Sequence, residues 1–174
     1  ASVNIENVIT IGTYAFQNCV NLNGVALNKG LTSLGNFAFK GCESLTSITL
    51  PSKIVKIGSS VFSGCSSLKN VAFEGNVTEI GSSAFEKTTA LASITIPSTV
   101  TKINGSAFAD SGLTKVVIPK SVTVIGGTNA YDQNNYTDEE FANSSGVFAR
   151  CLNLTEVVVE AGGAAEIGAS AFSG

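Results

Sequence analysis

Residues 57–79 read IGSSVFSGCSSLKNVAFEGNVTE, and the same pattern begins again at Ile80 and Gly81. Its skeleton is Ile-Gly-x-x-Ala-Phe-x-x-Cys-x-x-Leu-x-x-Val-x-Leu, followed by Pro in several copies and a short link to the next Ile-Gly. The leading position recurs every 23 residues, as Gly12, Gly35, Gly58, Gly81 and then Asn104. A fixed period of this length is typical of a solenoid, in which each repeat is one coil that buries its apolar face only against neighbouring coils.

Each repeat is predicted to contain two short extended segments. In the first, inward apolar residues alternate with small or polar ones, and this alternation predicts strands at 25–27, 48–50, 71–73, 94–96, 116–118 and 157–159. The second segment, as in Ile54-x-x-Ile57, closes on the recurrent glycine. At that glycine we expect either a positive φ or a close approach to the backbone of the neighbouring coil. Asn104, its one substitute, tolerates positive φ better than most residues.

The turn after the glycine carries the largest apolar side chain of each repeat. Stacking coils at the strand spacing of ~4.8 Å predicts one column of rings inside the solenoid, formed by Phe16, Phe39, Phe62, Phe85, Phe108, Phe148 and Phe172. The four cysteines Cys19, Cys42, Cys65 and Cys151 all lie three residues after a column Phe, where Thr88 and Ser111 stand in other repeats. The slot favours small structural thiols, with an incidental disulfide or a metal site as alternatives.

Segments such as 45–51 (LTSITLP) and 57–65 (IGSSVFSGC) resemble the BspA-like leucine-rich repeat, found in bacterial and protist surface proteins. The resemblance covers nearly the whole chain. It implies an α/β repeat solenoid, a right-handed leucine-rich-repeat superhelix of about 23-residue coils that is β-rich with short helical turns. It also implies an extracellular or cell-surface location and adhesion to a protein or glycan. The family has no shared catalytic residues, so the resemblance transfers no site.

The composition argues against several function classes. The chain has 174 residues, no His, and 13% charged residues, and it carries no nucleophile, phosphate-loop or metal motif, so we expect neither enzyme activity nor a cofactor. Residues 1–125 have nine Lys against six acids, and residues 126–174 have one Arg against seven, which is unlike the basic stripe of a nucleic-acid binder. We expect no transmembrane segment and no signal peptide in this chain, a monomer, and a segment of a longer protein that ends within a coil.

One segment, 127–146, does not follow the repeat. We expect a single leucine-rich-repeat solenoid domain over 1–174 with this segment as a loop insertion of about 18 added residues. It contains Tyr131, Tyr136 and Phe141 among acidic and Asn/Ser residues, a chemistry favoured in protein-binding loops. A tolerated surface insertion without a role remains the alternative. A weak calcium site also stays open, although the spacing from Asp132 fails the EF-hand pattern.

The outward strand residues change character beside the insertion. They are small in the early repeats and become charged or β-branched at Lys115, Val117, Glu156 and Val158. We therefore expect a non-catalytic binding module of an exported surface protein, with its contact surface formed by these four residues and the three insertion aromatics. A spacer or stalk without a ligand of its own is the alternative.

Overall fold

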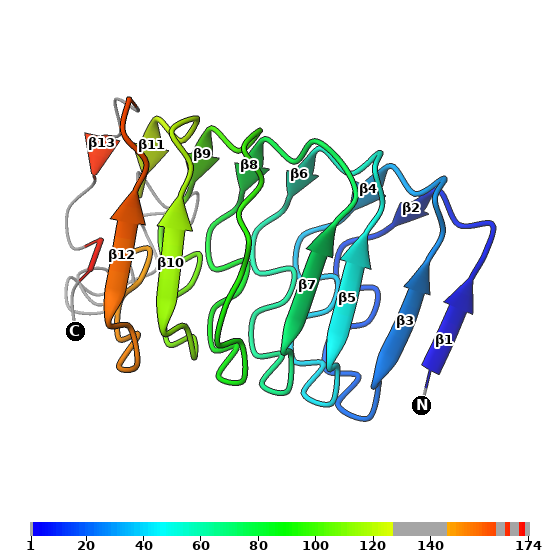
Figure 1. Ribbon diagram of the computed structural model, residues 1–174. Helices are drawn as coiled ribbons and strands as arrows, with labels where there is room; N and C mark the ends of the chain where they lie inside the picture. Colours follow the sequence, from blue (N-terminus) through cyan, green and yellow to red (C-terminus); the bar gives the residue numbers. More distant parts are fainter. Residues whose placement is uncertain (1, 127–145, 163–165, 168–170, 173–174) are drawn as a thin grey trace, which may run out of the picture.

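The computed structural model describes residues 2–126, 146–162, 166–167 and 171–172, which form a stack of coils with two rows of parallel strands (Figure 1). The front row consists of β1 (Ser2–Ile5), β3 (Gly24–Leu27), β5 (Ser47–Leu50), β7 (Asn70–Phe73), β10 (Lys115–Ile118) and β12 (Glu156–Val159). The second row consists of two-residue strands: β2 (Thr10–Ile11), β4 (Ser33–Leu34), β6 (Lys56–Ile57), β8 (Glu79–Ile80), β9 (Lys102–Ile103), β11 (Val124–Ile125) and β13 (Glu166–Ile167). The predicted solenoid of stacked coils is confirmed.

The front row is interrupted in two places, between β3 and β5 and at the coil that contains residues 94–96. Its strands pair as β1–β3, β5–β7 and β10–β12, and the predicted strand at 94–96 does not form. Burial nevertheless alternates there, with Thr95 exposed and Ile96 buried. The sequence alternation reports which side chains are buried, and here burial is achieved without the ladder of backbone hydrogen bonds that defines a strand.

A column of phenylalanine rings fills the core, as predicted. Neighbouring rings lie 5.1 to 5.7 Å apart between centroids and are nearly parallel from Phe16 to Phe172. The four middle rings, Phe39, Phe62, Phe85 and Phe108, are completely buried. One leucine per coil packs beside this column, for example Leu45 and Leu68. Each coil thus buries its apolar residues against the coils on either side.

The turns that carry these rings are not helical, which corrects the prediction of short helical turns. No helix is present among the residues that the structure describes. Ser60 and Gly64 have φ of 54° and 74°, whereas a helix needs consecutive residues near −63°. In this turn some backbone amides donate to the next coil and others donate within their own coil. Phe62 N donates to Ala84 O of the next coil at 2.9 Å, and Cys65 N donates to Phe62 O within the coil at 3.1 Å. Half of the turn therefore serves as a further ladder between coils.

The recurrent glycine is explained mainly by close approach. Gly35 and Gly81 are not at positive φ, unlike Gly126 at 91°. A Cβ on Gly81 would lie 2.7 Å from the carbonyl carbon of Gly58 in the preceding coil, so no larger residue fits there. Asn104 is not at positive φ either, and the tolerance of Asn for that conformation does not explain it.

The stack continues in register past the non-repetitive segment. Phe108 N donates to Val147 O at 2.8 Å, and the Phe108 and Phe148 rings are 5.5 Å apart. Gly146 O accepts a hydrogen bond from Ala149 N at 3.1 Å, as Ser106 O does from Ala109 N at 3.0 Å. Gly146 therefore occupies the position that Ser106 fills one coil earlier. The residues added to the coil are best counted as 128–145, because the flanking Gly127 and Gly146 correspond to Gly105 and Ser106, which are consecutive in the preceding coil.

Candidate functional site

The four strand residues predicted as contact residues lie together on β10 and β12. The two strands pair in parallel, with Lys115 opposite Glu156 and Val117 opposite Val158. Lys115 Nζ lies 2.8 Å from Glu156 Oε2, and their side chains are 52% and 51% exposed. A pair this exposed contributes only ~0–1 kcal/mol to stability, so its charges remain available to orient a partner.

The valines make this part of the front row different from the earlier coils. Val117 is 39% exposed, and Val158 beside it is half-buried. The equivalent positions of earlier strands carry Ala26, Thr49 and Ala72. We call Lys115, Val117, Glu156 and Val158 the β10–β12 face. It combines one exposed and one half-buried valine with a flanking ion pair, a combination that β1–β3 and β5–β7 lack.

The three insertion aromatics, Tyr131, Tyr136 and Phe141, lie outside the described residues, as do the acidic and amide side chains considered for calcium. The anchors of this segment are described. Gly126 follows β11 in the second row of strands, and its N–H donates to Ile103 O at 2.8 Å. The last described residue before this segment therefore belongs to the second row of strands, not to the row that contains the β10–β12 face.

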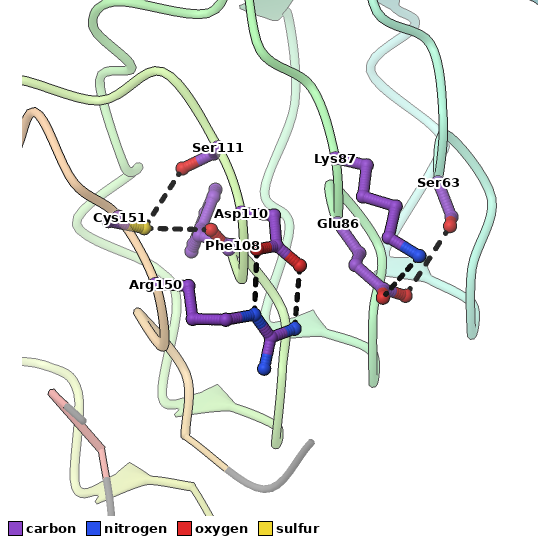
Figure 2. Close-up of polar contacts among 8 residues, drawn as sticks. All are labelled: Ser63, Glu86, Lys87, Phe108, Asp110, Ser111, Arg150 and Cys151. Atoms are coloured by element: carbon purple, nitrogen blue, oxygen red, sulfur yellow. Dashed lines mark hydrogen bonds and ion pairs between the residues drawn. The ribbon is translucent and has the colours of Figure 1, made fainter. Parts of the chain in front are cut away.

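An ion pair joins the two coils on either side of the insertion (Figure 2). Arg150 Nε and Nη2 lie 2.8 and 2.6 Å from Asp110 Oδ1 and Oδ2. The hydrogen bonds from Arg150 lower the pKa of Asp110, and those to Asp110 raise the pKa of Arg150. Sequence reasoning missed this pair because 39 residues separate its members. The available signal was their shared position, two residues after the column Phe.

The thiols have structural partners rather than reactive surroundings. Cys42, Cys65 and Cys151 are buried and donate to the column Phe carbonyl of the preceding coil, at 3.1, 3.2 and 3.0 Å. Ser111 Oγ lies 3.3 Å from Cys151 Sγ (Figure 2). Burial raises the pKa of Cys42 to about 11 and that of Cys65 to about 12. All four cysteines are free thiols, and only Cys19 is exposed.

The second row of strands carries a run of alternating charge. Glu79 on β8 lies between Lys56 on β6, at 2.9 Å, and Lys102 on β9, at 4.0 Å. Asn104 Nδ2 also donates to Glu79 Oε1, at 2.9 Å. The hydrogen bonds from Lys56 and Asn104 lower the pKa of the Glu79 carboxyl, so this carboxylate stays ionised.

Two partly exposed apolar features were not predicted. Tyr14 and Phe37 stack at 4.9 Å between ring centroids, with Lys40 Nζ 5.5 Å from the Phe37 centroid. Both rings follow a recurrent glycine by two residues, which was the signal in the sequence. A hollow of about 400 Å³ lies beyond the last described coil, lined by residues that include Leu152 and Phe172. We assign no ligand to that hollow.

Within the described ranges, no group of three or more Cys, Asp or Glu side chains is placed to hold a metal ion. The same residues include no helix with the length and hydropathy needed to cross a membrane.

The profile of the BspA type leucine rich repeat region matches residues 9–138 in six copies. The chain belongs to this family. The BspA-type repeats account for the 23-residue period, the column of rings and the thiol slot described above. No functionally curated protein matches the chain.

Solved leucine-rich repeat structures from bacteria are similar to this BspA-type chain. One is a leucine rich repeat protein of T. pallidum, with 27% identity and a TM-score of 0.75 over 91% of this chain and 70% of that one. A leucine rich cell surface protein of Faecalibacterium prausnitzii has 26% identity and a TM-score of 0.58 over 91% and 47%. A leucine-rich repeat protein of Bacteroides ovatus has 25% identity and a TM-score of 0.55 over 90% and 48%. The chain thus spans about half the length of the latter two.

Proposed function

We propose that this chain is a non-catalytic binding module of a cell-surface or secreted protein, a single repeat domain that holds an extracellular protein partner on its β10–β12 face. The supporting observation is the exposure of Val117 beside the Lys115–Glu156 ion pair, in a row of strands that is otherwise faced by small residues. Exposed aliphatic side chains bordered by charges are the composition of a protein contact surface. The aliphatic centre supplies affinity, and the flanking charges fix the orientation of the partner.

The family and one relative support the surface location. The relative from F. prausnitzii is described as a cell surface protein, and solenoids present extended ordered surfaces that suit binding. Adhesion to a matrix protein or to another cell is the activity that we assign to a chain of this kind. A monomer is sufficient for it, because the face is complete within one copy.

The added segment is the second element of the proposal. A loop of 18 residues can extend at most ~30 Å from its anchors, and we assign Tyr131, Tyr136 and Phe141 as further contact residues. Tyrosines supply large contact areas at a low cost in side-chain entropy. The segment and the β10–β12 face would contact one partner together.

A spacer is the second candidate, and one observation favours it. Ring stacking and backbone hydrogen bonds continue from coil to coil across the insertion, which gives a rod that could hold another domain away from a surface. A spacer requires no partner contact on the β10–β12 face, and the two functions therefore differ in what a substitution there does.

The test is binding to a panel of immobilised extracellular-matrix proteins, measured by biolayer interferometry. The parent is compared with Val117→Asp, with a deletion of 128–145, and with the control Thr49→Asp at the equivalent position of β5. The proposal expects binding by the parent and the control and weaker binding by the other two. Equal binding by all four proteins, or none by any, favours the spacer.

A further inference from the structure

A groove of about 400 Å³ lies on the second row of strands, across four successive coils. Ligand sites for small molecules have volumes of ~300–1,000 Å³, so this groove is of the size that takes a compact ligand rather than a flat protein surface. Its lining belongs to β6, β8 and β9, to the turns that follow them and, through Asn36, to the turn that follows β4. It is therefore separate from the β10–β12 face, and binding in the groove would not depend on the proposed function.

The recurrent glycines form the floor of this groove and two asparagines close its ends. Gly58 and Gly81 leave a strip of bare backbone, because a Cβ at Gly81 would collide with Gly58. The Asn36 side chain lies over Gly58 at one end, with its Oδ1 accepting a hydrogen bond from Ser59 N at 2.9 Å. At the other end Asn104 Nδ2 donates to Ile80 O at 3.2 Å. The two asparagine side chains therefore limit the length of the groove, which a strip of glycines alone would leave open at both ends.

One wall of the groove carries two lysines, Lys56 and Lys102, on either side of the glutamate Glu79. Glu79 Oε2 is paired with Lys56 at 2.9 Å. Lys102 Nζ lies 4.0 Å from Glu79 Oε1, which is beyond hydrogen-bond distance, and Asn104 already donates to that oxygen at 2.9 Å. Of the two lysines on this wall, Lys102 thus makes the longer contact with Glu79 and is the better placed to pair with a ligand. The opposite side of the groove includes Ser82.

We propose that this groove binds an acidic saccharide residue, a sugar that carries one carboxylate, with the carboxylate on Lys102 and ring hydroxyls on Glu79 and the two asparagine carboxamides. An ionised carboxylate such as Glu79 accepts hydrogen bonds from hydroxyl groups, and a carboxamide both donates and accepts them. The ligand carboxylate and the Lys102 ammonium form a charge-assisted hydrogen bond, which is about twice as strong as a neutral one. Two lysines and one glutamate give the wall a net charge of +1, which matches a single negative charge.

The same arrangement disfavours other classes of ligand. A phosphate dianion would place its second charge close to the fixed Glu79 carboxylate, and like charges at short distance repel. A neutral sugar would leave Lys102 with only its 4.0 Å contact to Glu79 Oε1. An extended acidic peptide would have to pass Asn36 or Asn104 at the ends of the groove. The combination of one available cation, one fixed acceptor and two carboxamides favours a hydroxylated monoanion.

The experiment is a titration of ¹⁵N-labelled protein followed by amide chemical shifts, with Gly58, Gly81 and the Asn104 side-chain amide as reporters. The probes are methyl β-glucuronide, the uncharged methyl β-glucoside, inorganic phosphate and a short Glu-rich peptide. We expect saturable shifts with the glucuronide and at least fivefold weaker binding of the glucoside. Lys102→Gln should weaken glucuronide binding about tenfold, because it removes a charge-assisted hydrogen bond. Lys102→Arg keeps the charge and should keep most of the binding.

Lys69→Gln is the matched control, since Lys69 is an exposed lysine that does not line the groove. Glu79→Gln should weaken glucuronide binding and strengthen phosphate binding, which a merely cationic patch would not do. Three results would overturn the proposal: no saturable shift at Gly58 and Gly81, tighter binding of phosphate or the peptide than of the glucuronide, or an equal effect of Lys69→Gln and Lys102→Gln. Unfolding midpoints of all variants distinguish lost binding from lost structure.

Discussion

Replacing Phe62 with alanine removes a ring that is packed on both sides. The Phe62 centroid lies 5.7 Å from that of Phe39 and 5.5 Å from that of Phe85, and its side chain is completely buried. Burying an aromatic side chain removes ~150–200 Å² of apolar area from water, and at ~25 cal/mol per Å² this stabilises the fold by ~4–5 kcal/mol. Measured Phe→Ala substitutions in cores cost ~3–5 kcal/mol, which is the loss we expect here.

Phe172→Ala is the matched comparison at the other end of the column. Phe172 stacks on Phe148 at 5.4 Å but is 43% exposed, so the same substitution removes little more than half of the buried area and leaves no closed cavity. We expect a loss of ~2–3 kcal/mol. Urea unfolding followed by far-UV circular dichroism gives both free energies of unfolding, provided that the slope with denaturant is unchanged. Equal losses for the two variants would refute the argument that each coil is stabilised by its two neighbours.

Two further predictions concern the thiols and the Asp110–Arg150 pair. Exchange of all four cysteines for serine should preserve the fold, since Ser111 already occupies the slot. In the folded parent, a thiol reagent should react with exposed Cys19 far faster than with Cys42 or Cys65, whose pKa values are about 11 and about 12. Titration of the denatured parent that yields fewer than four thiols would contradict this account. Asp110→Asn should lower the free energy of unfolding at pH 7 by at most ~1 kcal/mol, because the Arg150 side chain is 40% exposed. The folded pKa of Asp110 is lowered, so its stabilisation is present above the unfolded value of ~3.9 and is lost as the pH falls through the folded value. The difference between parent and variant in urea unfolding should therefore shrink as the pH is lowered below ~3.9, and a difference that stays constant over that range would count against the ion pair as its cause.

The period of the sequence was sufficient to predict the stack, the ring column and the positions of the thiols. Each of these depends on the side chain at one phase of a coil, and such positions superimpose directly when coils stack. The short helical turns implied by the family resemblance were wrong, and the pattern of apolar residues could not correct them because it does not report φ. Ser60 and Lys87, with φ of 54° and 58°, are residue types that give no warning of a left-handed conformation.

The candidate sites were predictable to different extents. Lys115 and Glu156 share a phase, and their pairing follows once the insertion is removed from the alignment. The Asp110–Arg150 pair was equally accessible by that argument and was missed because the insertion separates the two residues in the sequence. The groove was not predictable, since its shape depends on how the Asn36 and Asn104 carboxamides lie over a strip of glycines that the sequence presents only as a repeat marker.

The central claim is that the β10–β12 face and the added segment bind one protein partner, and the dissociation constant of the 128–145 deletion tests it most directly. This deletion keeps Gly146, which already holds its place in the coil, so the urea unfolding of the variant should match that of the parent. Against a partner from the matrix-protein panel we expect at least a tenfold weaker affinity, or ~1.4 kcal/mol, and a similar loss for Val117→Asp. A folded deletion variant that binds as tightly as the parent would contradict the claim and make the spacer the better account.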